Sequence, residues 1–381
     1  MTKTLFVAAC VIAGCGEMAW NRDSEMATDP QRARMDARTV LLQSVHSSDP
    51  LIRTHAVEAI GRTLGDQEGR ILLQGLADPA VSVQYAAAMA AGDIAYRPAG
   101  PRLVEIVKDP HSDQRVVSAA IYALHRMGSD AYTGQLAVLL HSEFDEGRAA
   151  AAAVMGKMGE PSAIGPLRSM LVDEKTPAVR LAIVESLTRL GDSASAQMLE
   201  SYAKQYFLDL RLAVIPTIGE LHVPGAQRIL RQLLRNAKNP PRVRVAAAGA
   251  MGTLGMYAND GYQMAQSALE NPDALLREFY GDKHAVSDVE RSSLQQLAAL
   301  ALGKMGNQKA LAVLHPFLQE DDPAVRVAAA MAVLQLLSPQ QPLTPVADEP
   351  APTPAPDETP SPARRLPRIQ SSGGMDELEE K

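Results

Sequence analysis

The residue types that most often carry out chemistry are few in this chain of 381 residues, and they do not form a recognisable reaction centre. Only two cysteines occur, Cys10 and Cys15, so no thiol is available further along for a metal site or a disulfide. None of the eight histidines precedes a glutamate, and no two are spaced as His-x-x-x-His, which argues against an oxygen-activating metal site. Glycine-rich phosphate loops and Gly-x-Ser-x-Gly elbows are also lacking. We therefore predict that the protein is not an enzyme and has no catalytic residue, metal or cofactor.

Composition favours helices. Hydrophobic residues make up 46% of the chain but aromatic residues only 4%, and alanine occurs in blocks such as 149–153. No stretch alternates β-branched and aromatic residues with polar ones, as a β-sandwich or barrel would require. The net charge of −7 argues against a nucleic-acid partner, since such proteins need a basic surface. The sequence therefore predicts an all-α protein whose partners are not nucleic acids.

The N-terminus has the layout of an export signal. Lys3 is followed by an uncharged segment, Leu5 to Gly14, which is too short to span a bilayer of about 30 Å. Its length and its small C-terminal residues are typical of a signal-peptide core. A buried first strand or helix is the alternative interpretation.

The end of that segment, Ile12-Ala13-Gly14-Cys15, resembles a bacterial lipoprotein lipobox. The resemblance implies that a lipid is attached to Cys15 and that the chain is cleaved between Gly14 and Cys15. More than one acyl chain on this residue would give stable membrane anchoring. We thus expect a signal peptide over 1–14, a polar tether over 15–34, and a location in the bacterial cell envelope, on the periplasmic or outer-surface side of a membrane. An uncleaved N-terminus on a cytosolic adaptor is the alternative.

One motif recurs along most of the chain. Asp49-Pro50-Leu51-Ile52-Arg53 returns in similar form at 176–180 and 322–326, and weaker copies lie between and beside them. The anchor residues of the nine copies follow one another at intervals near 32 residues, with one longer interval of 47. These anchors are Arg53, Gln84, Arg115, Arg148, Arg180, Arg211, Arg244, Arg291 and Arg326. Such a period indicates a solenoid of stacked structural units.

Each copy predicts a pair of helices. In residues 162–191 the apolar positions of 163–171 lie on one helical face, and a second helix begins at Thr176-Pro177 and ends at Gly191. Pro177 and Pro323 should therefore lie in the first turn of the second helix of their pairs. The nine anchors should form one ridge, and glycines such as Gly128 and Gly159 should end the second helices.

The pattern Asp-Pro-x-Val-Arg-x-x-Ala…Leu-Gly resembles HEAT-like repeats of the phycobilisome-lyase type over about residues 36–337. The resemblance implies an α-solenoid of about nine helical hairpins, placed at 35–337, whose anchor arginines pair with acidic or carbonyl groups of adjacent repeats. A bilin lyase or another HEAT-repeat enzyme is the alternative function. The missing His-Glu dipeptides and the export signal oppose it.

The long interval contains about fifteen additional residues, mostly 271–287. Phe279 and Tyr280 lie in this insert, and Tyr257 and Tyr262 precede it. Because aromatic side chains dominate binding hot spots, these four residues are the candidate binding residues for a protein partner. A loop packed on the solenoid is the alternative.

From 338 to 381 the composition changes abruptly, and ten of the 26 prolines fall in this segment. We expect a disordered, proline-rich tail that is unable to form a core. Together these features predict a protein-interaction scaffold that is anchored to a membrane through lipid on Cys15, with partners that the sequence does not identify.

Overall fold

The computed structural model describes residues 29–205, 207–257, 259–338 and 344–345. Within them the chain is all-α, apart from a two-residue parallel pairing of β1 (Met256–Tyr257) with β2 (Thr344–Pro345). The predicted fold class is confirmed. No helix in this part of the chain is both long and apolar enough to cross a membrane. The predicted signal peptide, Cys15 and nearly all of the predicted tail lie outside the described residues.

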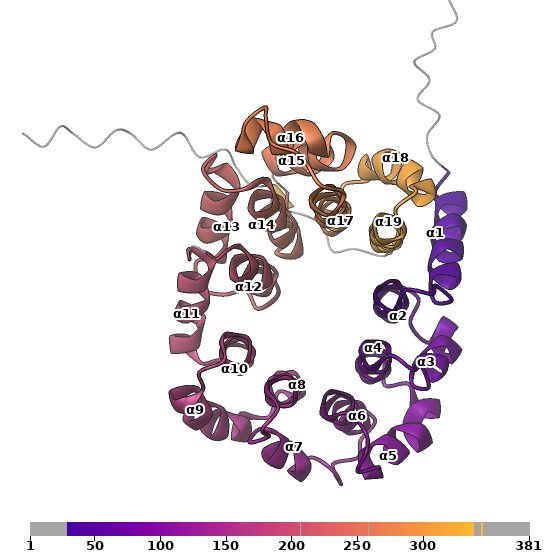
Figure 1. Ribbon diagram of the computed structural model, residues 1–381, viewed down its shortest axis with the longest axis vertical. Coiled ribbons are helices and arrows are strands. Elements are labelled where there is room, and N and C mark those ends of the chain that lie inside the picture. Colours follow the sequence, from indigo (N-terminus) through magenta and orange to yellow (C-terminus); the bar gives the residue numbers. More distant parts are fainter. Residues whose placement is uncertain (1–28, 206, 258, 339–343, 346–381) are drawn as a thin grey trace, which may run out of the picture. The chain divides into compact units, whose positions relative to one another are not determined.

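The helices form nine hairpins, as the repeat count predicts, each with an outer and an inner helix (Figure 1). The inner helices are α2 (Pro50–Thr63), α4 (Val81–Asp93), α6 (Gln114–Arg126), α8 (Asp145–Met158), α10 (Pro177–Arg189), α12 (Leu208–Glu220), α14 (Pro241–Thr253), α17 (Asp288–Lys304) and α19 (Pro323–Leu336). The outer helices are α1 (Pro30–Ser44), α3 (Gly69–Gly75), α5 (Gly100–Lys108), α7 (Gly134–Leu139), α9 (Ile164–Asp173), α11 (Ser193–Ala203), α13 (Ala226–Arg235), α15 (Asn259–Glu270) and α18 (Ala310–Leu314). Short 3₁₀ turns flank four of them: η1 (Gly65–Glu68), η2 (Arg97–Ala99), η3 (Pro161–Ala163) and η4 (His315–Gln319).

Local signals in the sequence fix the ends of the inner helices. Pro177 and Pro323 both occupy the first turn, as predicted, and Asp322 caps α19 by accepting hydrogen bonds from the next backbone amides. Gly191 ends its helix with a φ of 91°, which favours glycine. His222 stands where the next hairpin lacks that glycine and is forced to a φ of 50°.

The solenoid closes on itself, which the sequence did not predict. The last inner helix, α19, packs against both α1 and α2, so the described helices form a ring with the inner helices around its centre (Figure 1). Two polar contacts join the ends: Nε2 of His315 lies 3.0 Å from Oδ2 of Asp36, and the guanidinium of Arg34 donates to the carbonyl of Leu337. Neither terminal hairpin therefore has an uncovered stacking face.

Close approach of neighbouring inner helices depends on small residues. A Cβ atom added at Gly156 in α8 would lie 2.6 Å from Cα of Ser186 in α10, and one at Gly303 in α17 would lie 2.7 Å from Cα of Ala332 in α19. Ser186 adds a hydrogen bond of 2.8 Å from its hydroxyl to the carbonyl of Ala152. At these two glycine positions there is no room for a larger side chain between the inner helices.

Two boundaries differ from the sequence-based prediction. Residues 30–34 were assigned to the tether but begin α1, because Asp29 caps the helix and Ala33 and Ala37 bury one of its faces. The insert was expected to be a loop, yet it contains an extra helix, α16 (Pro272–Tyr280), between α15 and α17. Pro272 starts this helix, and Ser287 with Glu290 forms a capping box that starts α17.

The close approach of α8 and α10 can be tested with Gly156→Ala. The new methyl group should destabilise the fold by about 1–3 kcal/mol, since an overpacked core must shift backbone atoms. The matched control is Gly134→Ala at the start of α7, where no atom lies within 4 Å of an added Cβ. That variant should be as stable as the native protein or up to about 1 kcal/mol more stable. Urea unfolding measures both, and equal stability of the two variants would contradict the packing.

Candidate functional site

The anchor residues line one edge of the ring, at the connections between the outer and inner helices, which we call the AB rim. Eight of the nine predicted anchors stand four residues after the N-cap of their inner helix, as Arg53 does after Asp49. Arg115 is the exception, because it stands only two residues after Asp113 and bonds to that cap. The anchor position of α6 is instead occupied by the buried Val117.

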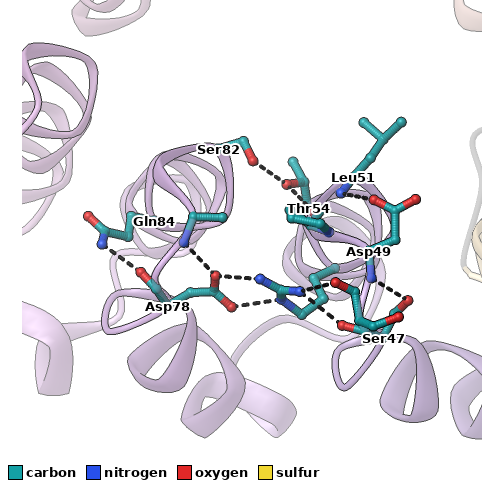
Figure 2. Close-up of polar contacts among 11 residues, drawn as sticks. Ser47, Asp49, Leu51, Thr54, Asp78, Ser82 and Gln84 are labelled. Carbon is teal, nitrogen blue, oxygen red and sulfur yellow. Dashed lines mark hydrogen bonds and ion pairs between the residues drawn. The ribbon is translucent and has the colours of Figure 1, made fainter.

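Arg53 shows how an anchor works (Figure 2). Its Nη1 donates to the carbonyls of Ser47 and Ser48 in its own loop, at 2.9 and 3.2 Å. Its Nε and Nη2 each donate over 2.8 Å to the carboxylate of Asp78 in the next hairpin. Gln84, the anchor of that next hairpin, reaches only its own loop, where it donates to the carbonyl of Asp78. The anchors therefore join consecutive AB connections.

The other anchors differ in the number of hydrogen bonds they make: Arg148 makes four, as Arg53 does, and Arg180 makes two. Arg148 donates to the carboxylate of Glu174 and Arg211 to the side chain of Asn239, each in the following hairpin. Arg180 reaches only backbone carbonyls of its own hairpin. Pairing with an acidic or carbonyl group of the adjacent repeat is confirmed for Arg53, Arg148 and Arg211, whereas Arg180 pairs only within its own hairpin. Since each of these guanidinium groups donates at least one hydrogen bond within the solenoid, the anchors stabilise the fold.

Arg148 lowers the pKa of Glu174 to about 2 by hydrogen bonding, which outweighs the burial of the carboxylate. Arg148→Met should therefore cost about 1–3 kcal/mol at neutral pH. Because a lowered carboxyl pKa stabilises the fold above its ordinary value of 4.5, the loss should shrink as the pH falls from about 4.5 to about 2. Unfolding measured across this range tests the prediction.

Arg180→Met is the control for this pH dependence, because Arg180 bonds to no carboxylate. It should destabilise the fold by a similar or smaller amount that does not change between these pH values. A pH-independent loss in Arg148→Met would contradict the assignment.

The inner surface carries a belt of charges. Nine residues after the anchor position, the first six inner helices each have a charged residue, and we call these six the inner belt: Arg62, Asp93, Arg126, Lys157, Arg189 and Glu220. Four of them follow a glycine that packs against the next inner helix, as Gly61 does against Ala90. The charged residue comes one position after the glycine, which is 100° around the helix. Its side chain therefore points away from the helix contact and toward the centre of the ring. The recurring pair of a glycine and a charged residue could have predicted the inner belt from the sequence.

Three helices share the most compact polar cluster on this surface. The hydroxyl of Tyr122 donates to Oδ1 of Asp93 over 2.6 Å, and Nζ of Lys157 lies 2.7 Å from the same oxygen. That Nζ also sits 4.9 Å from the centre of the tyrosine ring. Burial, and secondly the hydrogen bond to Asp93, raises the pKa of Tyr122, which keeps the hydroxyl protonated. The cluster satisfies its own charges and joins α4, α6 and α8.

A cavity of about 320 Å³ lies between inner helices that are far apart in the sequence, namely α2, α12, α14, α17 and α19. Its walls are largely apolar, but Arg62, Arg242 and Lys304 also line it. Burial lowers the pKa of Lys304, Glu220 acts in the opposite direction, and Arg62 adds to the lowering. Nε of Arg242 is buried without a hydrogen-bond partner among the described residues.

Of the four predicted aromatic binding residues, the structure places two, Phe279 and Tyr280, in contact with each other. Phe279 and Tyr280 lie at the end of α16 with ring centres 4.8 Å apart and edge to face, and His284 stacks on Tyr280 at the same distance. Tyr280 is 45% exposed and Phe279 is half-buried. Tyr262 is buried within α15 and is therefore unavailable to a partner. The side chain of Tyr257 lies outside the described part of the chain.

The exposed hydrophobic side chains are not scattered evenly. Of eight large ones in the described residues, seven lie at or within a helical turn of an AB connection: Leu51, Val138, Phe144, Val172, Phe207, Tyr280 and Val289. Met35, on α1, is the exception. The sequence analysis identified only Tyr280 among them, because exposure depends on which side of a hairpin end faces solvent.

The family model for HEAT repeats matches residues 69–136, 132–207 and 286–353, which is more than half of the chain. The chain belongs to the HEAT-repeat family. It is also similar to the solved complex of CpcE and CpcF of phycocyanin lyase from Nostoc sp. PCC7120, with 17% identity, a TM-score of 0.40, and coverage of 70% of this chain and 100% of that one. A search of curated proteins gives no significant match.

Human deoxyhypusine hydroxylase is similar at 18% identity and a TM-score of 0.34, over 72% of this chain and 97% of that one. The YibA protein of Escherichia coli is similar at 17% identity and a TM-score of 0.33, over 62% and 94%. Two of these three structures come from enzymes by their titles. The prediction that this protein is not an enzyme, which rests on the missing motifs, is therefore wrong, since the similar solved structures include enzymes. Among the described residues, no three histidine or acidic side chains cluster as metal ligands would.

Proposed function

We propose that the protein is a lipid-anchored scaffold of the bacterial cell envelope, which holds a protein partner along the AB rim. The concentration of exposed hydrophobic side chains at that rim carries the proposal. Single exposed hydrophobics are ordinary on any protein surface, but here seven gather near the AB connections of five of the nine hairpins, three of them consecutive (α7/α8, α9/α10 and α11/α12). A solenoid presents such a surface to an extended partner, which can contact several repeats in turn.

The geometry at the rim suits this role. Phe144 is 64% exposed at the N-cap of α8, although a capping position normally takes a polar residue. Beneath it Arg148 bonds to Glu143 and Glu174, so the exposed ring stands on a connection that is already fixed. A partner would then bind without first having to order this loop, which lowers the entropic cost of association.

The anchoring part of the proposal is supported by the sequence before the first helix. Ile12-Ala13-Gly14-Cys15 follows an uncharged segment and precedes a polar stretch that ends at the cap of α1, Asp29. A lipid on Cys15 would place the ring beside a membrane through a short tether and leave its rim accessible to proteins of the same compartment.

Mass spectrometry of the mature N-terminus tests the anchor. We expect the chain to begin at Cys15 carrying acyl groups, and to fractionate with membranes. Cys15→Ser should keep an unprocessed N-terminus and lose the lipid. An intact Met1 on the wild-type protein would remove the anchor and leave the cytosolic adaptor.

Partner binding at the rim can be tested with Phe144→Ala and Tyr280→Ala. Each removes an exposed ring, so the melting temperature should hardly change, whereas in-cell crosslinking to the partner should weaken by a factor equivalent to about 2 kcal/mol or more if the ring is an anchor. Met35→Ala is the matched control, since Met35 is 70% exposed but lies away from the rim.

The double variant Phe279→Ala with Tyr280→Ala separates binding from packing at the insert. Phe279 is half-buried, so this variant should also lower the melting temperature. Equal crosslinking in the rim variants, the double variant and the Met35→Ala control would overturn the rim as the partner surface.

A further inference from the structure

The cavity between the inner helices is not used by a partner that binds at the rim, and its shape is distinctive. Five residues of α17 line it, from Ser293 to Lys304. With a rise of 1.5 Å per residue, these positions extend over about 16 Å along the ring axis. The cavity is thus elongated, and its volume of about 320 Å³ is near the lower end of small-molecule sites, which measure roughly 300–1,000 Å³.

The middle of the cavity is apolar. Aliphatic side chains from three inner helices, α12, α17 and α19, face it: Leu212, Leu297, Leu300, Val327 and Met331. Gln296 and Ser293 are the polar residues of α17 between these and the charged ends. A long, narrow and apolar space favours a linear hydrocarbon, because such a chain loses water along its whole length on entry.

The two ends of the cavity differ in charge. Arg242 is in the first turn of α14, and Arg62 and Lys304 are in the last turns of α2 and α17, at the opposite edge of the ring. None of these three cations forms a hydrogen bond or ion pair within the described residues, although Glu220 acts on Lys304 through its charge. Arg242 instead acts on Tyr280, where its positive charge opposes the rise in the pKa of the hydroxyl that burial causes.

With Glu58 and Glu220 included, the cavity keeps one positive charge in excess. Glu58, one turn before Arg62 in α2, and Glu220, at the end of α12, lie toward the end with two cations, but no hydrogen bond joins either acid to Arg62 or Lys304 within the described residues. Both cations can therefore donate to an anion placed between them. Partial burial of Lys304 strengthens its attraction for such an anion and makes its charge costly, whereas Arg62 is exposed to solvent.

We propose that this cavity binds a linear aliphatic monocarboxylate, with the carboxylate between Lys304 and Arg62 and the hydrocarbon along Leu300, Leu297 and Met331. The carboxylate accepts charge-assisted hydrogen bonds from the two cations and balances the excess charge. The site is independent of the rim and of the lipid on Cys15, so the scaffold proposal can fail while this one stands.

Isothermal titration of the full-length protein with decanoate tests the site. We expect saturable binding that Lys304→Met weakens about tenfold or more, since a hydrogen bond between charged partners is lost. Arg242→Met is the matched control, because it removes a cation from the far end of the same cavity and should leave the affinity within a few-fold. Decanol and acetate should bind weakly, as each lacks one half of the recognised chemistry.

Circular dichroism and the melting temperature of each variant establish that it is folded, and Arg62→Met provides a second test of the same end. Three outcomes would overturn the proposal: no decanoate binding by the native protein, equal binding of decanol, or undiminished affinity in folded Lys304→Met and Arg62→Met. A loss confined to Arg242→Met would also overturn it, since the carboxylate would then lie at the wrong end.

Discussion

The close contact between successive inner helices is the constraint on which the rest of this structure depends. Gly61, Gly156 and Gly303 each place the backbone of one inner helix against the next, and a single methyl group would not fit there. Consecutive outer helices pack far less on one another than the inner helices do. When one layer of a solenoid is drawn together more tightly than the other, each hairpin turns toward the tighter layer. Accumulated along the nine hairpins, these turns bring α19 back to α1 and α2 (Figure 1).

Ring closure removes the need for special terminal hairpins at the two ends of the solenoid. An open array needs terminal hairpins with polar outer faces, since each end would otherwise expose a stacking surface. Here α1 and α19 cover each other, and two polar contacts add to their packing, with His315 beside Asp36 and Arg34 on the carbonyl of Leu337. The contact between α10 and α12 differs from those of the other neighbouring inner helices. These two helices barely touch, and the outer helix α11 packs against both of them. There the hydroxyl of Thr217 donates to Glu185 over 2.7 Å and links the two inner helices directly.

The sequence predicted what depends on neighbouring residues. Pro177, Pro323 and Gly191 mark helix ends through backbone conformation alone, so the hairpins and their number could be derived without a structure. Ring closure could not, because it is the sum of many small rotations between helices that no single residue specifies. The repeat spacing also could not show that Arg115 lies outside the anchor position of its helix. Its spacing of 31 from Gln84 fits the repeat, and only the position of the cap Asp113 shows that Val117 holds the equivalent place.

The exposed residues of the candidate binding surface were also only partly predictable from the sequence. Residue type alone suggested aromatic side chains, yet Tyr262 is buried while Leu51, Val138 and Val172 are exposed. What decides exposure is the position within the hairpin: residues at the AB connection leave the helix stack, and those in the middle of an inner helix face another helix or the ring centre. The same rule separates the two kinds of surface. The six charges of the inner belt, four of which follow a glycine, point inward, and hydrophobic side chains are exposed at the AB rim. Because one repeat places both, a partner along the rim and a ligand inside the ring would be held by the same helices, and α17, which carries Val289 at one end and Lys304 at the other, contributes to both.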